Sequence, residues 1–381
     1  MKLIITLLLS VYSITAISSS PVEKDQGVIK VHSLNPANKP LQESLEYKNA
    51  RIVELGQTPL SMQVDKIKKL EMNDHFLFIQ TSKNLYAYTH DGQLITQIGR
   101  KGEREDEYNE LGTLYVDNSK KQITIIDYTE NKMIHYDFWG SYLSTDTVPD
   151  GSFKWTYQTI ATGDKKLLNY NGMSMDDTRP YSLLDLEKKE ICGRYFSYYP
   201  VTVDNYVYPF SWHPMTQAGN DVDLILPLSD TIYTYSAATS SFQPKYLIET
   251  FQKMAPKEKI RKHTPSYSGD LSKLSQQGFF TGFNGIYETD ADVLLEYESI
   301  AMGYFLFNKS SRTGNYYLYS VDNNDKTLPF YHTTYSYKNE FVAYVDSGKL
   351  KSLTGIKDKK IKDKIKSLRY NSTCLIFYEL K

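Results

Sequence analysis

Short hydrophobic stretches alternate with turn residues along most of the chain from about residue 64 onward. Two neighbouring regions show this pattern most clearly, and they match when one is shifted against the other. Tyr88 then falls on Tyr136 and Gly92 on Gly140, a shift of 48 residues (88 to 136). Strands at this spacing with glycine turns indicate a series of antiparallel hairpins. A period in the forties with four strands per unit is typical of β-propeller blades.

Weaker copies of the pattern follow, and together they make about six units, the last incomplete. The sequence therefore predicts an all-β fold, a six-bladed β-propeller with short helical insertions. One insertion is expected within 251–276 and a clearer helix within 353–369, where Ile361, Ile365 and Leu368 fall on one face. The later units are expected at 155–193, 205–250, 283–320 and 329–346.

The two ends of the patterned region each contain a candidate strand. Residues 51–55 form the first, and residues 372–380 form the last. A ring of blades needs one blade completed from both ends of the chain, because closure removes the open sheet edge. We therefore expect Val53 and Ile376 to lie in one sheet.

The first residues place Lys2 ahead of a short apolar stretch that ends in small residues. This pattern is typical of a secretory signal peptide, which we expect at 1–18, and the stretch is too short to span a bilayer. A buried N-terminal strand is the alternative. Residues 19–50, polar and proline-containing, are expected to be a tether, and 51–381 the propeller. No cysteine lies near the cleavage region, so no lipid anchor is expected, and no later stretch predicts a transmembrane segment.

Composition narrows the function classes only slightly. The net charge of −1 argues against a basic nucleic-acid binder. Tyrosine, with 33 copies against 16 phenylalanines, fits twisted sheets that are exposed on one side, and it fits carbohydrate or peptide binding as well. The two cysteines, Cys192 and Cys374, both lie in strand-like segments, and we expect buried free thiols there rather than a disulfide framework.

One segment resembles a known family. Residues 98–108 read IGRKGEREDEY, and Gly99, Arg100, Gly102, Glu107 and Tyr108 match a segment of the exported six-bladed β-propellers of gut anaerobic Gram-negative bacteria, which are related to NHL-repeat propellers. The family has Gly-Pro-Gly where this chain has Arg104-Glu105-Asp106, which predicts a stiffer, more charged loop. The strand at 228–233 and the closing strand are also similar to the family's. The resemblance covers residues 50–381 and implies export and the propeller fold, but almost nothing about activity.

Motifs for catalysis and cofactor binding do not occur in the sequence. It contains no glycine-rich phosphate loop, no His-Glu-x-x-His, no Cys-x-x-Cys and no nucleophile elbow. Residues 321–325 approach a calcium loop most nearly, but an acidic hairpin turn explains them better. We accordingly expect no catalytic residues, no metal and no cofactor.

The charged loop at 100–108 is the first candidate binding site. Loops between blades lie on one face of a propeller, where binding sites concentrate because the scaffold is rigid. Arg100 and Arg104 could hold a carboxylate or sulfate through paired hydrogen bonds. The alternative, which we favour, is that Arg100 and Glu107 pair with backbone or with each other and fix neighbouring blades. Tyr108 belongs to the same loop.

The aromatic segment at 206–214 is the second candidate. Trp212 could stack on a sugar, with His213 as a hydrogen-bonding group, and Trp155 and Tyr157 could line the same channel mouth. A packing role between blades is the alternative and is somewhat favoured.

These observations favour an exported, non-catalytic propeller, periplasmic or extracellular after signal-peptide cleavage. It would bind a glycan, a peptide or an envelope protein through one loop face. A polysaccharide hydrolase or lyase acting at the channel is the alternative, since carboxylates such as Glu107 could act as acid or base. A structural envelope subunit is the second alternative.

Overall fold

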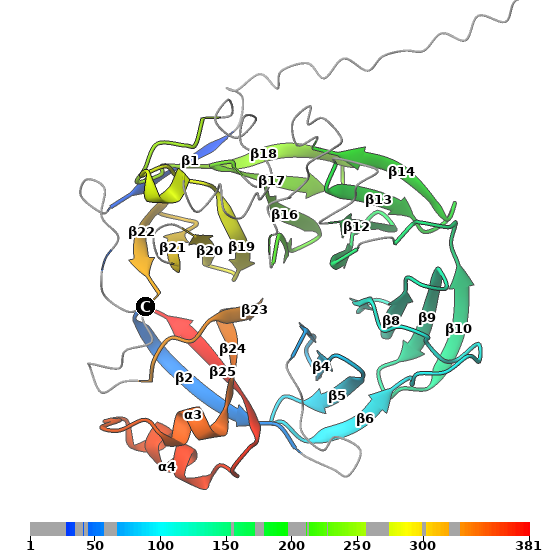
Figure 1. Cartoon of the computed structure of the whole chain (residues 1–381), viewed down its shortest axis with the longest axis horizontal. Coiled ribbons are helices and arrows are strands. Elements are labelled where there is room, and N and C mark those ends of the chain that lie inside the picture. The colour runs from blue at the N-terminus through cyan, green and yellow to red at the C-terminus, as the bar shows by residue number, and fades with distance from the viewer. Residues whose placement is uncertain are drawn as a thin grey trace, which may run out of the picture.

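The structure is a computed structural model of the chain. It describes residues 28–34, 41, 45–56, 67–153, 156–171, 179–196, 211, 213–226, 228–256, 274–298, 302–319 and 328–381. Strands dominate the described residues, and the fold is all-β and β-propeller-like. Figure 1 shows its sheets standing side by side around a common centre.

Three sheets are simple four-stranded antiparallel meanders, in which strands follow one another in chain order. The first sheet contains β3 (Lys69–Met72), β4 (Phe76–Gln80), β5 (Leu85–Thr89) and β6 (Leu94–Ile98). The second contains β7 (Thr113–Asp117), β8 (Gln122–Asp127), β9 (Lys132–Asp137) and β10 (Tyr142–Thr147). The third contains β11 (Gln158–Ala161), β12 (Lys166–Tyr170), β13 (Tyr181–Asp185) and β14 (Glu190–Tyr195).

A nine-stranded sheet joins two further meanders through one extra strand. One meander contains β15 (Met215–Ala218), β16 (Asp221–Ile225), β17 (Thr231–Ser236) and β18 (Ser241–Ile248). The other contains β19 (Phe283–Glu288), β20 (Asp292–Glu298), β21 (Met302–Asn308) and β22 (Thr313–Leu318). Strand β1 (Ile29–Ser33) lies between β18 and β22 and is parallel to both. The segment expected to be only a tether thus contributes a strand, because the outer edges of two meanders offer it hydrogen-bonding partners on both sides.

The last sheet is completed from both ends of the described chain. Its strands are β2 (Tyr47–Glu54), β23 (Thr333–Tyr337), β24 (Glu340–Asp346) and β25 (Thr373–Leu380). β2 pairs antiparallel with β25, so that Ile52 lies opposite Ile376 and Val53 opposite Leu375. The expected meeting of the two chain ends in one sheet is confirmed. Because β25 is paired on both sides, the last strand of the chain has no open edge, and β2 and β23 form the two edges of this sheet.

The first strands of successive meanders contact one another in a closed circuit. β3 contacts β7, β7 contacts β11, and β11 contacts β15. β15 contacts β19, β19 contacts β23, and β23 returns to contact β3. These strands surround the centre seen in Figure 1, and the later strands of each meander lie farther out.

The two regions that match in sequence have the same local structure. Tyr88 and Tyr136 occupy the third strands of their sheets, β5 and β9. Gly92 and Gly140 follow in the next turns with φ of 87° and 86°. Residues with a side chain rarely adopt φ values in this region, so glycine is favoured at both turns. At Gly92 an added Cβ would also lie 2.2 Å from the Glu54 carbonyl oxygen.

The helix expected within 353–369 is confirmed as α4 (Lys359–Ser367). Its N-cap, Asp358, accepts hydrogen bonds from the Lys360 and Ile361 backbone amides at 2.8 and 3.1 Å. Ile361 and Ile365 are buried, as the apolar face predicts. The short helix α3 (Ser347–Lys351) precedes it and was not expected. Most of the expected insertion at 251–276 lies outside the described residues.

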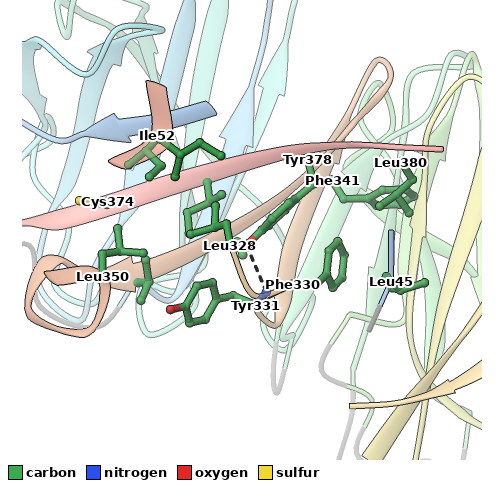
Figure 2. Packing of buried hydrophobic residues seen from close by; sticks show 14 of the residues in the cluster. Leu45, Ile52, Leu328, Phe330, Tyr331, Phe341, Leu350, Cys374, Tyr378 and Leu380 are labelled. Atoms are coloured by element: carbon green, nitrogen blue, oxygen red, sulfur yellow. Dashed lines mark hydrogen bonds between the residues drawn. The ribbon is translucent and has the colours of Figure 1, made fainter. Parts of the chain in front are cut away.

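Apolar side chains form the core between neighbouring sheets rather than at the ring centre. Figure 2 shows the part around the closing sheet, where Ile52 and Tyr378 pack with Phe341. Cys374 lies in this cluster and is buried, whereas Cys192 is exposed, so the expectation of two buried thiols is wrong for Cys192. That residue lies on β14, an outer strand that packs on one side only.

Tyrosines fill these spaces between sheets, which corrects the expectation that they cover exposed sheet faces. In several of them the ring is buried and the hydroxyl group donates to a backbone carbonyl oxygen of a neighbouring segment. Tyr181 donates to Ile225 at 2.6 Å, and Tyr136 donates to Asp106 at 2.6 Å. The tyrosines among the largest fully buried side chains are Tyr88, Tyr108, Tyr136, Tyr170, Tyr181, Tyr235, Tyr287, Tyr297, Tyr316 and Tyr378.

Candidate functional site

A small cavity lies at the ring centre, among the first strands of the sheets. Its volume is about 80 Å³, and Glu71, Gln158, His213 and Tyr335 are among the residues that line it. A water molecule takes up about 30 Å³ of liquid. Pockets for organic ligands usually measure about 300 to 1,000 Å³. The cavity therefore has room for a few waters and none for a polysaccharide chain.

Lys69 holds three first strands together beside this cavity. Its ammonium group donates to the Leu114 carbonyl oxygen at 2.5 Å and to the Thr159 carbonyl oxygen at 3.4 Å. It also forms an ion pair with Glu71 at 3.2 Å. Burial lowers the pKa of Lys69, and the carboxylate of Glu71 opposes that effect. Because β3, β7 and β11 each contribute a partner, the contacts of this lysine are structural.

Two further polar side chains bridge neighbouring sheets at the centre. The amide group of Gln158 donates to the Met215 carbonyl oxygen at 2.9 Å and accepts from the Met215 amide at 3.1 Å. It thereby occupies the backbone groups of β15 as a neighbouring strand would. The Tyr335 hydroxyl donates to Glu71 at 3.0 Å. The polar side chains of the cavity therefore serve mainly to join the sheets.

His213 lines the cavity and lies two residues before β15, at the end of the ring where the first strands begin. Its backbone pairs with β19 at Gly285, and its Nδ1 lies 2.8 Å from the Ile286 carbonyl oxygen. The ring stacks on Tyr287 with centroids 4.5 Å apart. Burial lowers the pKa of His213 to about 4, so the ring is neutral at pH 7. For His213 this is the packing role that sequence reasoning favoured, while residues 206–210 lie outside the described residues.

A histidine–carboxylate pair near His213 was missed by the sequence reasoning. His332 Nε2 lies 2.8 Å from Glu296 Oε1, and the two side chains are 40% and 4% exposed. Burial lowers the pKa of His332, but the hydrogen bond and charge of Glu296 outweigh it and raise that pKa above its usual value. Glu296 pairs in register with Gly285, which places the pair beside His213. We call His213, Glu296 and His332 the channel-mouth cluster.

No spacing in the sequence points to this cluster. Glu296 is on the second strand of one meander, and His332 precedes the first strand of the next. They meet only because neighbouring first strands converge at the centre. A glutamate within a hydrophobic strand is the one available signal, since a buried charge needs a partner.

In the charged loop, Glu107 is the centre of the interactions. Arg100 Nε donates to Glu107 Oε1 at 2.7 Å, and Arg104 Nε lies 3.1 Å from the same oxygen. The Arg104 backbone amide donates to Glu107 Oε2 at 3.1 Å. The hydrogen bond from that amide and the two guanidinium groups hold the pKa of Glu107 below its usual value. Both arginines therefore bind a carboxylate of the loop itself, as the favoured alternative predicts.

The same loop fixes neighbouring sheets to each other. The Tyr108 hydroxyl donates to the Lys83 carbonyl oxygen of the first sheet at 2.9 Å. Thr145 of β10 donates to the Glu105 carbonyl oxygen at 2.8 Å. Gly102 leaves room for the Glu107 carboxylate, because an added Cβ would come within 1.9 Å of one of its oxygens and displace it. The side chain of Arg100 nevertheless remains 60% exposed.

The structure separates the two predicted binding regions. His213 lines the central cavity, whereas the lining contains no residue of the loop at 100–108. Tyr157 is 44% exposed and directly precedes Gln158 of the cavity wall. Trp155, Trp212 and residues 321–325 lie outside the described residues.

Across the described ranges, no group of three or more His, Cys, Asp or Glu side chains has the arrangement of a metal site. In that same part of the chain, no helix has both the length and the apolar character needed to cross a membrane.

Comparison with solved structures supports the fold. A Bacteroides fragilis protein that is inferred to be exported is similar, with a TM-score of 0.73 and 19% identity over 93% of this chain and 99% of that one. A member of the DUF4221 family from Bacteroides vulgatus has a TM-score of 0.54 and 10% identity over 90% of this chain and 99% of that one. At these identities the likeness concerns the fold alone. No curated protein matches. A family model does match, over residues 27–373, and the chain therefore belongs to the family described as a domain of unknown function, DUF4934.

Proposed function

We propose that the chain is an exported, non-catalytic six-bladed β-propeller that binds a partner through the loops at the channel-mouth end of its strands. The observation that carries the proposal is that polar side chains at the ring centre form hydrogen bonds to the backbone of neighbouring strands. Lys69 and Gln158 each join neighbouring strands by hydrogen bonds to backbone groups. A centre occupied in this way leaves binding to the loops, which a rigid ring holds in fixed positions.

Six blades are supported by the closed circuit of first strands and by the completion of the last sheet by β2. In this interpretation the nine-stranded sheet is two blades joined by β1. Export is supported by the leader-like residues 1–18 and by the inferred export of the similar Bacteroides fragilis protein. Cleavage after Ser18 would leave the described strands intact.

The binding surface is proposed to include His332 and Arg100. Both side chains are accessible, at 40% and 60% exposure, and both are oriented by a more buried carboxylate. A side chain that is already oriented by an ion pair loses little conformational freedom when it donates a hydrogen bond to a partner. A glycan, a peptide and an envelope protein can each accept hydrogen bonds from them.

Crosslinking in the native envelope tests the proposal. The full chain carries an affinity tag, and partners are identified after crosslinking and quantified by mass spectrometry. We expect Arg100→Gln combined with His332→Gln to reduce recovery of the specific partner about tenfold. Lys165→Gln is the matched control, because Lys165 is an exposed cation in the β11–β12 turn at the other end of the strands. Equal recovery from both variants, or no crosslinked partner in the envelope, would refute the proposed surface.

The same preparation tests export. The mature N-terminus, measured by mass spectrometry on the envelope fraction, is expected at Ser19. A chain that retains Met1–Ser18 in the cytosolic fraction would contradict export while leaving the binding surface testable on purified protein.

A further inference from the structure

A larger hollow lies at the opposite end of the strands from the channel-mouth cluster. Its volume is about 560 Å³. In a meander, the first and third turns lie at one strand end, and the second turn and the connection to the next sheet lie at the other. The hollow is lined from first and third turns, so it faces away from the loop at 100–108. We call it the hairpin-end groove, and its lining includes Asp74, Phe76, Asn118, Phe138, Trp139 and Tyr337.

Trp139 gives the groove an exposed aromatic wall. It is 58% exposed, although its turn is well ordered by hydrogen bonds. Its backbone amide donates to Asp137 Oδ1 at 2.9 Å. The indole meets the ring of Phe76 nearly edge to face, with centroids 5.5 Å apart and an interplanar angle of 80°. Phe76 in turn packs on Phe138 at 5.7 Å. The indole thus contacts one buried ring, Phe76, which is itself held by Phe138, and the exposed surface of Trp139 is oriented before any ligand arrives.

Asp74 supplies a fixed acceptor in the same groove. The Tyr337 hydroxyl donates to its Oδ1 at 2.6 Å, and the Lys338 ammonium group lies 2.7 Å from that same oxygen. These hydrogen bonds lower the pKa of Asp74 to about 2, so it is ionised at neutral pH. Because both bonds use Oδ1, Oδ2 is available as an acceptor. Asn118, which is exposed in the β7–β8 turn, adds an amide that can donate and accept.

The chemistry of the lining selects among ligand classes. One negative charge on Asp74 and one positive charge on Lys121 leave the lining nearly neutral, which disfavours nucleic acid and strongly charged ligands. A peptide that binds by strand addition would need an open strand edge to pair with, whereas turns form this wall. A sugar ring has an apolar C–H face and hydroxyl groups around its rim. The negative face of an indole attracts such C–H groups, and a carboxylate with a free oxygen accepts from the hydroxyls.

We propose that the hairpin-end groove is a carbohydrate-binding site, in which Trp139 stacks on the apolar face of a pyranose ring and Asp74 Oδ2 accepts a hydrogen bond from a ring hydroxyl. The size of the groove is within the range of about 300 to 1,000 Å³ that is typical of ligand pockets. The site goes beyond the proposed function, because it lies at the other end of the strands and shares no residue with the channel-mouth cluster or the charged loop.

Affinity electrophoresis of the full chain through gels containing neutral polysaccharides tests the proposal. The probes are laminarin, pullulan, xylan and galactomannan, each in a separate gel. We expect at least one to retard the wild-type chain. Trp139→Ala is expected to weaken that binding about tenfold, equivalent to about 1.4 kcal/mol. Asp74→Ala is expected to weaken it as well, and Trp139→Phe less than Trp139→Ala, because a smaller aromatic face remains.

Tyr370→Ala is the matched control, because Tyr370 is an aromatic side chain 77% exposed away from the groove. It should leave the retardation unchanged, and unfolding midpoints of all variants should confirm that they fold. The proposal is overturned if no probe retards the wild type, or if Trp139→Ala and Tyr370→Ala bind equally. Binding lost in Arg100→Gln with His332→Gln but kept in Trp139→Ala would also overturn it, and would assign the sugar to the other end of the ring.

Discussion

Replacing Tyr378 by phenylalanine removes one oxygen from the closing sheet and leaves its shape unchanged. The ring of Tyr378 is fully buried on β25, and its hydroxyl donates to the Pro329 carbonyl oxygen at 2.6 Å. The Tyr378 hydroxyl oxygen also accepts a hydrogen bond from the Tyr331 backbone amide at 3.2 Å. Figure 2 shows Tyr378 beside Phe330 and Tyr331, two residues of the segment that leads into β23. The hydroxyl therefore ties the last strand of the chain to the start of the sheet that it completes.

The magnitude follows from the two backbone groups that lose their partner. A buried donor or acceptor left unpaired costs about 1 to 3 kcal/mol. Two such groups predict a loss of about 2 to 4 kcal/mol in the free energy of unfolding, after some relaxation of the segment. No cavity term is added, because phenylalanine keeps the ring.

Chemical denaturation of the full chain, followed by tryptophan fluorescence, measures this loss. Tyr370→Phe makes the same chemical change on an exposed ring and should shift the unfolding free energy by less than about 0.5 kcal/mol. The reasoning is refuted if the two variants unfold at the same denaturant concentration. That result would mean that the closing sheet tolerates two unpaired backbone groups.

Three further predictions concern other parts of the molecule. Gly102→Ala should displace the Glu107 carboxylate and speed tryptic cleavage of the charged loop several-fold, and an unchanged cleavage rate would show that the loop has room for a Cβ. Asp358→Ala should cost α4 about 1 kcal/mol of unfolding free energy through loss of its N-cap, whereas exposed Asp363→Ala on the same helix should change it little; equal losses would contradict the capping role. The pKa of His213, lowered from 6.5 to about 4, predicts stability that is complete above pH 6.5 and falls by up to about 3 kcal/mol as the pH drops towards 4, because only the unfolded state then binds the proton. Denaturation of wild type and His213→Gln across this range should show a steeper fall in the wild type, because other groups such as His135 titrate in both, and parallel curves would contradict the role of His213.

The repeated strand pattern predicted most of the second, third and fourth strands of the sheets. The two matching regions were expected to be hairpins, and they place Tyr88 on β5 and Tyr136 on β9, each the third strand of its sheet. The first strands were mostly missed, for example β11 (Gln158–Ala161) and β15 (Met215–Ala218). β11 and β15 have four residues each, and residues of both line the central cavity, so polar side chains such as Thr159 and Thr216 interrupt the apolar pattern. Their side chains pair across sheets, and sequence periodicity cannot reveal that.

The candidate site was less predictable because it depends on contacts between sheets. The resemblance led to the loop at 100–108, and the alternative that its charges pair internally was favoured correctly. The pairing of Glu296 with His332 could not be foreseen, since it requires knowing which first strands are neighbours. The groove beside Trp139 was also missed, because its turns come from three separate sheets.

The abundance of tyrosine illustrates how composition can mislead about function. A tyrosine-rich chain is compatible with carbohydrate binding, yet the largest buried tyrosines here serve as spacers between sheets. Each sheet twists away from its neighbour, and a long ring with a polar end fills the widening gap and reaches a backbone carbonyl oxygen across it, as Tyr181 does to Ile225. These tyrosines are therefore explained by the core. An aromatic ring is informative about binding where packing does not require it, and Trp139, held in a defined turn yet largely exposed, meets that condition.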